Sequence, residues 1–236
     1  MNDKIIGIIG GMGPEATADL FMKIIQKTKV EKDQDHFRII IDNNPKIPDR
    51  TKAILYGGES PVEELIKTAK NLEKAGVDVA CIPCMTSHYF IQEIQKSVSY
   101  PIINAFEVVR KHIIKHYPNV KKIGVLATTG TVKMGMYEKY LEFAKVIYPS
   151  STIQEEKVME AIYGEKGIKR GVKNEIPLNL LRDAAKHLIS QGAELIILGC
   201  TEIGLVLKQE HVEVPVIDPM DVLADELIKY HPGEGE

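Results

Sequence analysis

The chain has few cysteines, little net charge and no long hydrophobic run, and each shortage excludes a class of protein. Three cysteines are too few for a disulfide framework, and the N-terminus does not resemble an export signal, so we expect free thiols in a reducing cytoplasm. A net charge of −3 over 236 residues gives no bias towards nucleic acid or a membrane surface. The longest apolar stretches, such as Leu195–Leu198, fall far short of the roughly 20 residues of a membrane helix. We therefore expect a cytoplasmic protein that binds neither nucleic acid nor membrane.

What the sequence does contain is an internal duplication. The ten residues that end at Cys84 (AGVDVACIPC) match the ten that end at Cys200 (QGAELIILGC), and the two cysteines are 116 positions apart (200 − 84 = 116). Further matched segments are 4–13 with 122–130, and 101–108 with 215–222. Two copies are too few for a solenoid, which needs about three stacked repeats. The duplication therefore predicts two similar domains.

Short β-branched runs alternate with longer amphipathic segments, which is typical of parallel sheets covered by helices on both faces. The expected strands are Ile5–Ile9, Arg38–Asp42, Val77–Ile82, Ile102–Asn104, Lys122–Ala127, Ser151–Glu155, Leu195–Leu198 and Val216–Ile217. The expected helices are Ala16–Lys27, Ser60–Ala75, Ser87–Val98, Phe106–Tyr117, Met136–Tyr148, Pro177–Gln191 and Asp221–Tyr230. We predict two pseudo-symmetric, three-layer α/β domains, one formed by residues 1–103 plus 213–236 and the other by residues 104–212. Residues 231–236 are expected to form a frayed tail.

Ligands of open parallel sheets bind beyond the carboxyl ends of the strands, so the loops that follow the predicted strands are the candidate site. Both Cys84 and Cys200 lie in such loops, each at the end of an apolar run and close to a threonine. Free cysteine has a pKa of about 8.5, and backbone N–H groups at a strand-to-helix turn lower it. An isolated cysteine is more often a buried small hydrophobe than a catalyst, but a matched pair at strand ends favours catalysis.

Four ordered motifs together resemble the aspartate/glutamate racemase family, and they are most similar to its aspartate racemase branch. They are GIIGGMGPEAT at residues 7–17, DNNP with IPDRT at 42–51, PCMTSH at 83–88, and LGCTE at 198–202. The resemblance covers nearly the whole chain. It implies a cofactor-independent amino-acid racemase with its active site in the cleft between the two domains, and a cytoplasmic homodimer that acts on a small acidic amino acid.

The chemistry of racemisation agrees with this resemblance. An amino-acid α-proton is very weakly acidic, so a racemase without an electron-sink cofactor needs positioned bases and strong electrostatic stabilisation of the carbanion. We expect one of Cys84 and Cys200 to abstract the proton as a thiolate, while the other reprotonates the opposite face as a thiol. The two roles would exchange with the handedness of the substrate.

Two cations are candidates for binding substrate carboxylates. An arginine fork binds a carboxylate through two hydrogen bonds, and Arg50 follows a rigid Ile-Pro segment; the resemblance implies the same role, with Asp49 as its orienting neighbour. The resemblance also implies a tyrosine–lysine loop that begins at Tyr163, in which the context favours Lys169 over Lys166. Two cations suit a dicarboxylate, which favours aspartate or glutamate as the substrate.

The remaining candidate site residues surround these positions. The hydroxyl groups of threonines at strand ends can donate to a substrate or cap a helix, and the glycines beside Met12 allow the backbone to approach a carboxylate. His88 follows Cys84 by four residues, so it can support the thiolate or orient the loop. The family usually has asparagine where this chain has Met85, which affects the expected substrate choice. The further candidates for substrate binding or support are Thr86, Thr128, Thr131, Thr201 and Glu202.

Other chemistries remain open at this stage. Cys81 and Cys84 have a redox-like C-x-x-C spacing, but that spacing leaves Cys200 unexplained, so Cys81 is expected to pack in the core. No metal site is expected, because a closed zinc site normally needs four ligands and the sequence has no second cysteine–histidine pair with suitable spacing. The segment from Gly11 to Ala16 fits G-x-G-x-x-A, which would suit an NAD(P)-binding oxidoreductase. A non-catalytic protein that binds acidic amino acids is the second alternative.

Overall fold

The computed structural model describes residues 4–230 and divides into two compact units, each containing a four-stranded parallel sheet. The first unit comprises Met1–Val108 and Met220–Glu236, and the second comprises Val109–Pro219. In the structure the unit boundaries come after Val108 and after Pro219, whereas the boundaries expected from the sequence come after residues 103 and 212. Two helices, α5 (Ala105–His116) and α11 (Pro219–Lys229), account for this difference, because each one runs across a unit boundary. The tail expected at 231–236 lies outside the described residues.

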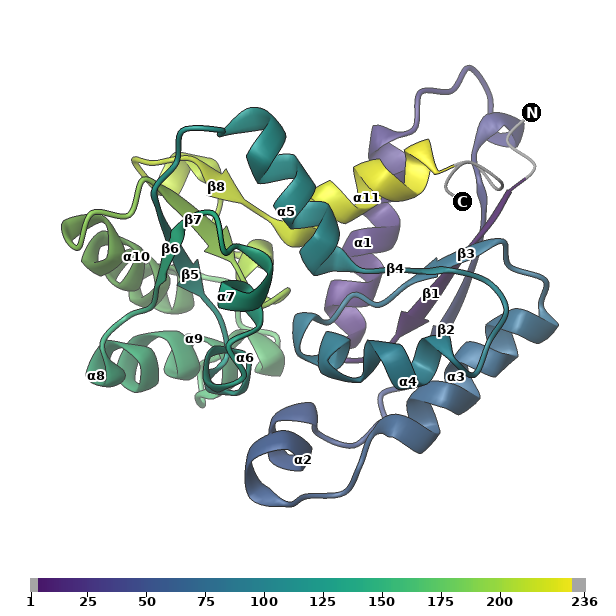
Figure 1. Ribbon diagram of the computed structural model, residues 1–236, viewed down its shortest axis with the longest axis horizontal. Coiled ribbons are helices and arrows are strands. Elements are labelled where there is room, and N and C mark those ends of the chain that lie inside the picture. The colour runs from purple at the N-terminus through teal and green to yellow at the C-terminus, as the bar shows by residue number, and fades with distance from the viewer. Residues whose placement is uncertain (1–3, 231–236) are drawn as a thin grey trace. The chain divides into compact units, whose positions relative to one another are not determined.

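The sheet of the first unit has the strand order β2-β1-β3-β4 (Figure 1). Its strands are β1 (Ile5–Gly10), β2 (Arg38–Asn43), β3 (Val79–Cys81) and β4 (Ile102–Ile103). In this register Ile8 of β1 pairs with Ile41 on one side and with Cys81 on the other. Cys81 is therefore a core residue with no exposed surface, as the sequence predicted.

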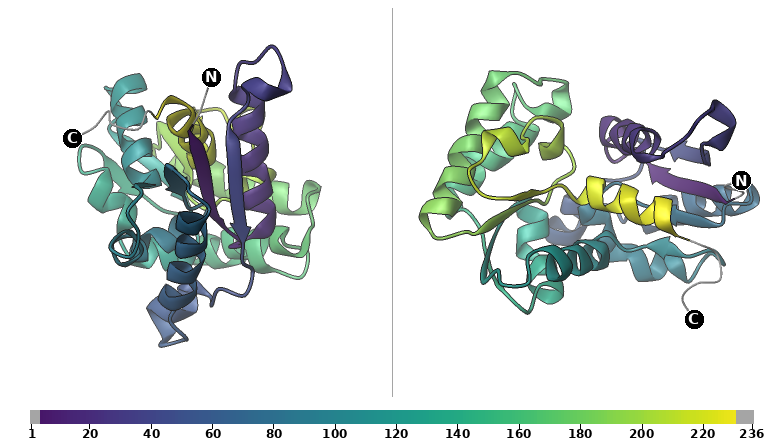
Figure 2. Two further views of the ribbon diagram at one scale, coloured as in Figure 1. Left: turned by 90° about the vertical axis from the view of Figure 1, so that its right-hand side faces the viewer. Right: turned by 90° about the horizontal axis from the view of Figure 1, so that it is seen from above.

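Helices cover both faces of this sheet, and Figure 2 shows α1 (Pro14–Lys27) and α3 (Val62–Lys74) on opposite sides of it. Helix α3 buries a stripe that contains Leu65, Ala69 and Leu72, spaced three to four residues apart as a core-facing helix requires. The other helical segments of this unit are η1 (Asp33–Asp35), α2 (Arg50–Tyr56), the 3₁₀ turn η2 (Met85–Phe90) and α4 (Ile91–Gln95).

The second unit repeats this topology, with its strands in the order β6-β5-β7-β8. They are β5 (Lys122–Leu126), β6 (Lys145–Ile147), β7 (Leu195–Leu198) and β8 (Val216–Ile217). In each unit the second strand along the chain lies at one edge of the sheet, and the first, third and fourth strands follow it across the sheet in that order. Both sheets are parallel throughout, so the predicted α/β class is confirmed.

Helix α10 (Glu175–Ser190) forms much of the core of the second unit through buried residues such as Leu181 and Leu188. It packs with α9 (Glu160–Tyr163) and with a π-helical segment, η3 (Gln154–Met159). The other helical segments are α6 (Thr129–Lys133), α7 (Met136–Tyr140), α8 (Ser151–Ile153), η4 (Ile168–Arg170), η5 (Ile203–Leu205) and η6 (Gln209–His211).

Two of the predicted elements are wrong, and both lie in the second unit. The expected strand 151–155 is helical, because the Ser150 side chain accepts a hydrogen bond from the Ile153 N–H and caps a helix there. The strand beside β5 is instead β6, within the helix expected at 136–148, which ends at Tyr140. Helix α2 was not expected at all, and the helix expected at 87–98 starts as the 3₁₀ turn η2.

The starts of the central strands are fixed in the same way in both units. Gly76 and Gly192 have φ values of 76° and 88°, as glycines at helix C-termini require. Two residues later, Asp78 accepts a hydrogen bond from the Ile5 N–H at 2.6 Å, and Glu194 accepts one from the Lys121 N–H at 2.7 Å. Each sheet therefore has the same kind of acidic side-chain anchor at the amino ends of its strands.

Candidate active site

Cys84 lies three residues after the end of β3 and immediately before η2. The chain turns tightly here, because the Cys84 N–H donates to the Ile82 carbonyl at 2.8 Å and the Ser87 N–H donates to the Cys84 carbonyl at 3.2 Å. Cys84 and Met85 are only 6% and 2% exposed. The thiol is thus set at the carboxyl end of the sheet, in a buried loop that other groups hold in place.

His88 is one of those groups. Its Nδ1–H donates to the Cys84 carbonyl at 3.0 Å, and its Nε2 accepts from the Ala105 N–H at 3.0 Å. Both ring nitrogens are therefore used in the neutral tautomer, and burial lowers the pKa of His88 to about 4. Of the two roles considered from the sequence, these contacts support the orientation of the loop.

Arg50 and Met12 are brought together beside this loop. The Arg50 guanidinium donates to the carbonyls of Pro48 at 3.0 Å and of Met12 at 3.3 Å, and Ser87 Oγ lies 3.2 Å from Met12 Sδ. Backbone carbonyls orient a guanidinium without cancelling its charge. The sequence did not single out Ser87, although this residue lies within the motif at residues 83–88.

Asp49 has a local structural role. Its side chain accepts a hydrogen bond from the Lys52 N–H at 2.8 Å and so caps the first turn of α2. Arg50 is the first residue of that helix, so the cap also fixes the backbone from which the guanidinium extends.

Cys200 occupies the corresponding loop of the second unit, two residues after the end of β7. Its Sγ donates to Glu202 Oε2 at 3.0 Å, and the Thr201 hydroxyl donates to the same oxygen at 3.2 Å. Cys200, Thr201 and Glu202 are buried, with 6%, 4% and 4% exposure. Burial, together with the negative charge of Glu202, raises the pKa of Cys200 well above its ordinary value.

The other oxygen of Glu202 forms an ion pair with Lys169. Burial alone would raise the pKa of Glu202, but the Lys169 ammonium group outweighs it and keeps that pKa below its usual value. The ammonium group also lies 5.6 Å from the centre of the Tyr163 ring, within the range of a cation–π contact. The structure thus brings Cys200, Thr201, Glu202, Lys169 and Tyr163 into one cluster.

The threonines expected near the site have different surroundings. Thr128 caps α6 by accepting a hydrogen bond from the Thr131 N–H at 3.3 Å, and the two hydroxyl oxygens are 3.2 Å apart. Thr128 and Thr131 are 3% and 0% exposed, and Thr86 is also buried. The structure therefore gives Thr128 and Thr131 a capping role at the end of β5.

Gln154 is a neighbour of this loop that the sequence did not reveal. Its Nε2 donates to the Ala127 carbonyl at 2.8 Å, while its Oε1 is buried without a hydrogen-bond partner in the described part of the chain. Gln154 starts the π-helical segment η3, a helix type that is frequent at functional sites. The sequence pattern had suggested a strand here, so it could not have indicated this contact.

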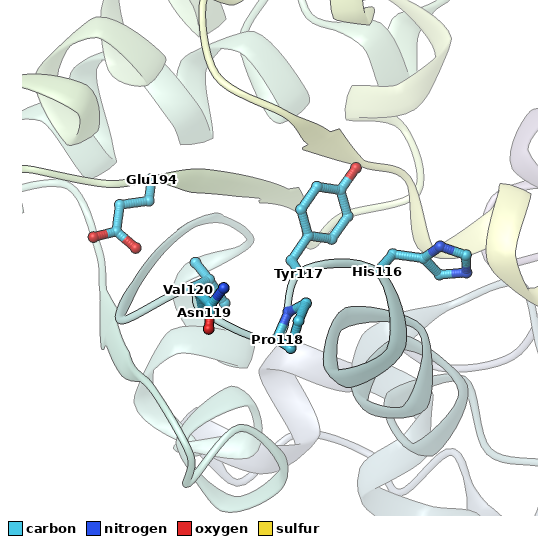
Figure 3. Close-up of a pocket in the computed structure, with 6 residues that line it drawn as sticks. All are labelled: His116, Tyr117, Pro118, Asn119, Val120 and Glu194. Carbon is cyan, nitrogen blue, oxygen red and sulfur yellow. The ribbon is translucent and has the colours of Figure 1, made fainter.

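The second unit also has a surface pocket of about 340 Å³ (Figure 3). It is lined by His116, Tyr117, Pro118, Asn119, Val120 and Glu194. Glu194 and Val120 precede β7 and β5, so the pocket lies at the amino ends of the strands, whereas Cys200 follows the carboxyl end of β7. The pocket therefore belongs to the opposite edge of the sheet.

Within residues 4–230, the structure holds no group of three or more His, Cys, Asp or Glu side chains placed to bind a metal ion. All three cysteines are buried free thiols. No helix in the same range is long and apolar enough to span a membrane. In the glycine-rich loop, the Gly11 N–H donates to Thr17 Oγ1 at 3.0 Å, so this donor is already used within the loop.

Comparison with known proteins defines the class of the chain. A family model described as Asp/Glu/Hydantoin racemase matches residues 9–227. The broad specificity amino-acid racemase RacX of Bacillus subtilis is 29% identical over 227 residues, which cover 93% of this chain and 95% of that protein. A glutamate racemase of Aquifex pyrophilus is 27% identical over 201 residues, covering 78% of this chain and 72% of that protein.

A solved structure agrees with these matches. The aspartate racemase of Picrophilus torridus has 30% sequence identity and a TM-score of 0.78, covering 96% of this chain and 93% of that one. The protein is therefore an isomerase, an amino-acid racemase. It belongs to the Asp/Glu/hydantoin racemase family. These relatives do not favour an NAD(P)-binding oxidoreductase or a non-catalytic binding protein.

Proposed function

We propose that the protein interconverts L- and D-aspartate, or the corresponding glutamates, without a cofactor, using Cys84 and Cys200 as its two acid–base groups. The observation that carries this proposal is their equivalent placement. Each cysteine follows the third strand of a parallel four-stranded sheet, where that strand's loop turns into a 3₁₀ segment. Such loops are the usual position of catalytic groups in parallel α/β folds.

The proposed reaction needs two opposite proton transfers at one carbon. One sulfur, as thiolate, takes the α-proton, and the electron pair of the C–H bond stays on the carbon as a carbanion. The other sulfur, as thiol, gives its proton to the opposite face and becomes the thiolate. The substrate is inverted, no atom is gained or lost, and the reverse reaction uses the same two sulfurs in exchanged roles.

Arg50 and Lys169 are the proposed ligands of the substrate carboxylates. Arg50 has a fork held by backbone carbonyls beside Met12, and Lys169 is held by a carboxylate that a substrate carboxylate can replace. Two cations suit a substrate with two carboxylates better than a neutral amino acid. The aspartate racemase among the solved structures supports this assignment. The alternative is a wider range of amino-acid substrates, as the name of the Bacillus subtilis relative describes for that protein.

Met85 is the proposed reason for any departure from the usual specificity. It is only 2% exposed and lies in η2 next to Cys84, where the resembling family usually has asparagine. A methionine cannot donate a hydrogen bond, so any contact that the asparagine amide makes with substrate is lost here. The remaining donors near this loop are the hydroxyl groups of Thr86 and Ser87 and the backbone.

The test is α-proton exchange in D2O, started from each enantiomer of aspartate and glutamate separately. We expect the wild-type protein to invert the substrate and to place deuterium on the product. Cys84→Ser and Cys200→Ser should each reduce racemisation by about 100- to 10,000-fold, the usual contribution of a general acid or base. Each variant should still exchange the proton of one enantiomer without inversion, and the two variants should act on opposite enantiomers.

Cys81 provides the matched control. It is a third thiol with no exposed surface, on β3 three residues before Cys84, so Cys81→Ala should retain racemisation. Full racemisation by both single serine variants would eliminate the two-thiol mechanism. Binding of aspartate without any exchange in the wild-type protein would instead support a binding protein.

We also propose a homodimer in the cytoplasm, which the family resemblance implies. Sedimentation equilibrium at several protein concentrations measures the first point directly. A mass of 26.4 kDa at every concentration would be that of the single chain and would contradict the dimer.

A further inference from the structure

Three groups converge on the carboxylate of Glu202. Oε2 accepts from Cys200 Sγ at 3.0 Å and from the Thr201 hydroxyl at 3.2 Å, while Oε1 is paired with Lys169. Glu202 is only 4% exposed, so these contacts replace the water that its ionised carboxylate would otherwise bind. A thiol that donates to a buried carboxylate is positioned to transfer its proton along that hydrogen bond.

Among the described residues 4–230, no carboxylate paired with a lysine accepts a hydrogen bond from Cys84. Four residues along, His88 uses both ring nitrogens in contacts with backbone groups of Cys84 and Ala105, and it is neutral. The thiol of Cys200 therefore differs from that of Cys84 in having an ionised acceptor at hydrogen-bond distance. This difference concerns the proton of Cys200 and not the shape of its loop.

We propose that Glu202 is the proton acceptor that converts Cys200 to its thiolate, and that Lys169 controls when it accepts. This inference rests on the function proposed above, because it assigns Cys200 a proton-transfer role. In the free protein, Lys169 keeps Glu202 ionised and weakly basic, and Cys200 remains a thiol. A substrate carboxylate that pairs with Lys169 weakens the ion pair and raises the proton affinity of Glu202 more than that of Cys200, because Glu202 contacts Lys169 directly.

The proton balance of the step is closed. The Sγ–H bond of Cys200 breaks, its proton moves to Glu202 Oε2, and the electron pair remains on sulfur. The thiolate then takes the substrate α-proton, and Cys84 delivers its own proton to the opposite face. After the product leaves, Lys169 returns to Glu202, which releases its proton to water, and the Cys84 thiolate takes one from water. The reverse reaction retraces these steps.

Other ionisable groups act on this cluster and enter any pH dependence. Tyr137 interacts electrostatically with Cys200 and with Asp218, and burial raises the pKa of Tyr137 well above its ordinary value, so it stays neutral. Tyr163 contacts Lys169 through its ring. Glu202 is therefore the charged group that contacts the Cys200 thiol, Lys169 is the charged group that contacts Glu202, and these two are the groups to change.

The first test measures the ionisation of Cys200 directly, from the ultraviolet absorbance of its thiolate as a function of pH. In a Cys81→Ala/Cys84→Ser background Cys200 is the remaining one of the chain's three cysteines, so the thiolate absorbance belongs to it. We expect Glu202→Gln to lower the apparent pKa of Cys200, since the negative charge is lost and the positive charge of Lys169 remains. Lys169→Met should raise it.

The second test measures racemisation with Cys84 restored. Glu202→Gln should reduce kcat for aspartate by about 100-fold or more, the usual loss of a general base. Glu202→Asp should recover part of that loss, because it restores a carboxylate. The equilibrium constant of racemisation is one, so kcat/KM must fall equally from both enantiomers. Glu194→Gln is the matched control, because Glu194 makes its contact with Lys121 at the other edge of the sheet and should leave the rate unchanged.

The outcomes separate this inference from the proposed function. A Glu202→Gln variant that racemises as fast as wild type, or an apparent pKa of Cys200 that neither substitution moves, would overturn the role of Glu202 while leaving the two-thiol reaction in place. A wild-type protein that racemises no acidic amino acid would instead remove the proposed function. The thiolate titration would still show whether Glu202 and Cys200 are coupled.

Discussion

The loop that carries Cys84 and the loop that carries Cys200 follow equivalent strands but surround their thiols with different charges. Cys84 is braced by a neutral histidine whose two ring nitrogens bond to backbone groups, whereas Cys200 donates to a carboxylate that is paired with a lysine. Equivalent topology therefore fixes where each thiol is placed, while the side chains two to four residues later give the two thiols different hydrogen-bond partners. The two sulfurs of this racemase should be treated as chemically different groups.

The largest effect on stability should come from the histidine. His88 is neutral in the folded protein, with a pKa of about 4, and an unfolded histidine titrates near its ordinary value of 6.5. Between those values the unfolded chain binds the proton and the folded chain does not, so folding stability is lost as the pH falls from 6.5 through about 4. The loss should amount to about 3 kcal/mol in the free energy of urea unfolding.

His88→Gln tests this assignment, because its amide can donate to the Cys84 carbonyl and accept from Ala105 but does not titrate. The variant should lose the acid-dependent part of the unfolding free energy that His88 contributes. The matched control is His116→Gln, which makes the same substitution at the exposed end of α5. If the unfolding free energy of His88→Gln fell with pH as steeply as that of the wild-type protein, other groups would cause the acid sensitivity.

The two cations, Arg50 and Lys169, also have different partners, so they should differ in how well each tolerates replacement by the other type of cation. Arg50 is held by carbonyls in a fixed fork geometry, which a lysine ammonium cannot reproduce. Loss of a charge-assisted contact is worth about 1.5–3 kcal/mol, so Arg50→Lys should reduce kcat/KM for aspartate by about 10- to 150-fold. Lys169→Arg keeps a cation that can pair with Glu202 and should have a smaller effect. Steady-state kinetics with both variants checks the order, and a larger loss for Lys169→Arg would reverse it.

The smallest effects should come from the lysines at the starts of the two sheets. Lys4 is 8% exposed, and its ammonium group donates to three carbonyls at the end of α11, including that of Leu227 at 2.7 Å. Lys122 makes one such contact, to the Gln191 carbonyl at 2.8 Å, in an exposed setting. Lys4→Met should lower the unfolding free energy by about 2 kcal/mol. Lys122→Met should lower it by less than about 1 kcal/mol, and equal losses in urea unfolding would contradict the distinction.

Much of the fold could be predicted because strand and helix periodicity is a local signal. The apolar runs of β1, β5 and β7 and the amphipathic spacing of α1, α3 and α10 identify these elements without tertiary information. The failures lie where the elements are short. The three-residue strand β6 shows too few alternations to separate it from the end of a helix, and the cap at Ser150 precedes a segment whose composition suits a strand.

The candidate site was predictable in its residue types but not in its contacts. The internal repeat indicated Cys84 and Cys200, and strand order explains why both lie at carboxyl ends. The pairing of Glu202 with Lys169 joins residues 33 positions apart and depends on how the loop before α10 folds back, which no local pattern encodes. The double use of His88 likewise depends on the position of the Ala105 N–H, 17 residues away.

The contacts that Asp78 and Glu194 make, each within its own sheet, have a practical consequence. The backbone N–H groups of these residues donate to the carbonyls of Ile5 and Lys122, both at 2.9 Å. The shorter Asp78 side chain returns to Ile5 itself, while that of Glu194, longer by one methylene, reaches back one residue further to Lys121. These anchors lie at the ends of the strands remote from the thiols, so we expect an exchange of the segments after β3 and β7 between the halves to leave them in place. Such chimaeras would separate what a loop contributes from what its supporting sheet contributes.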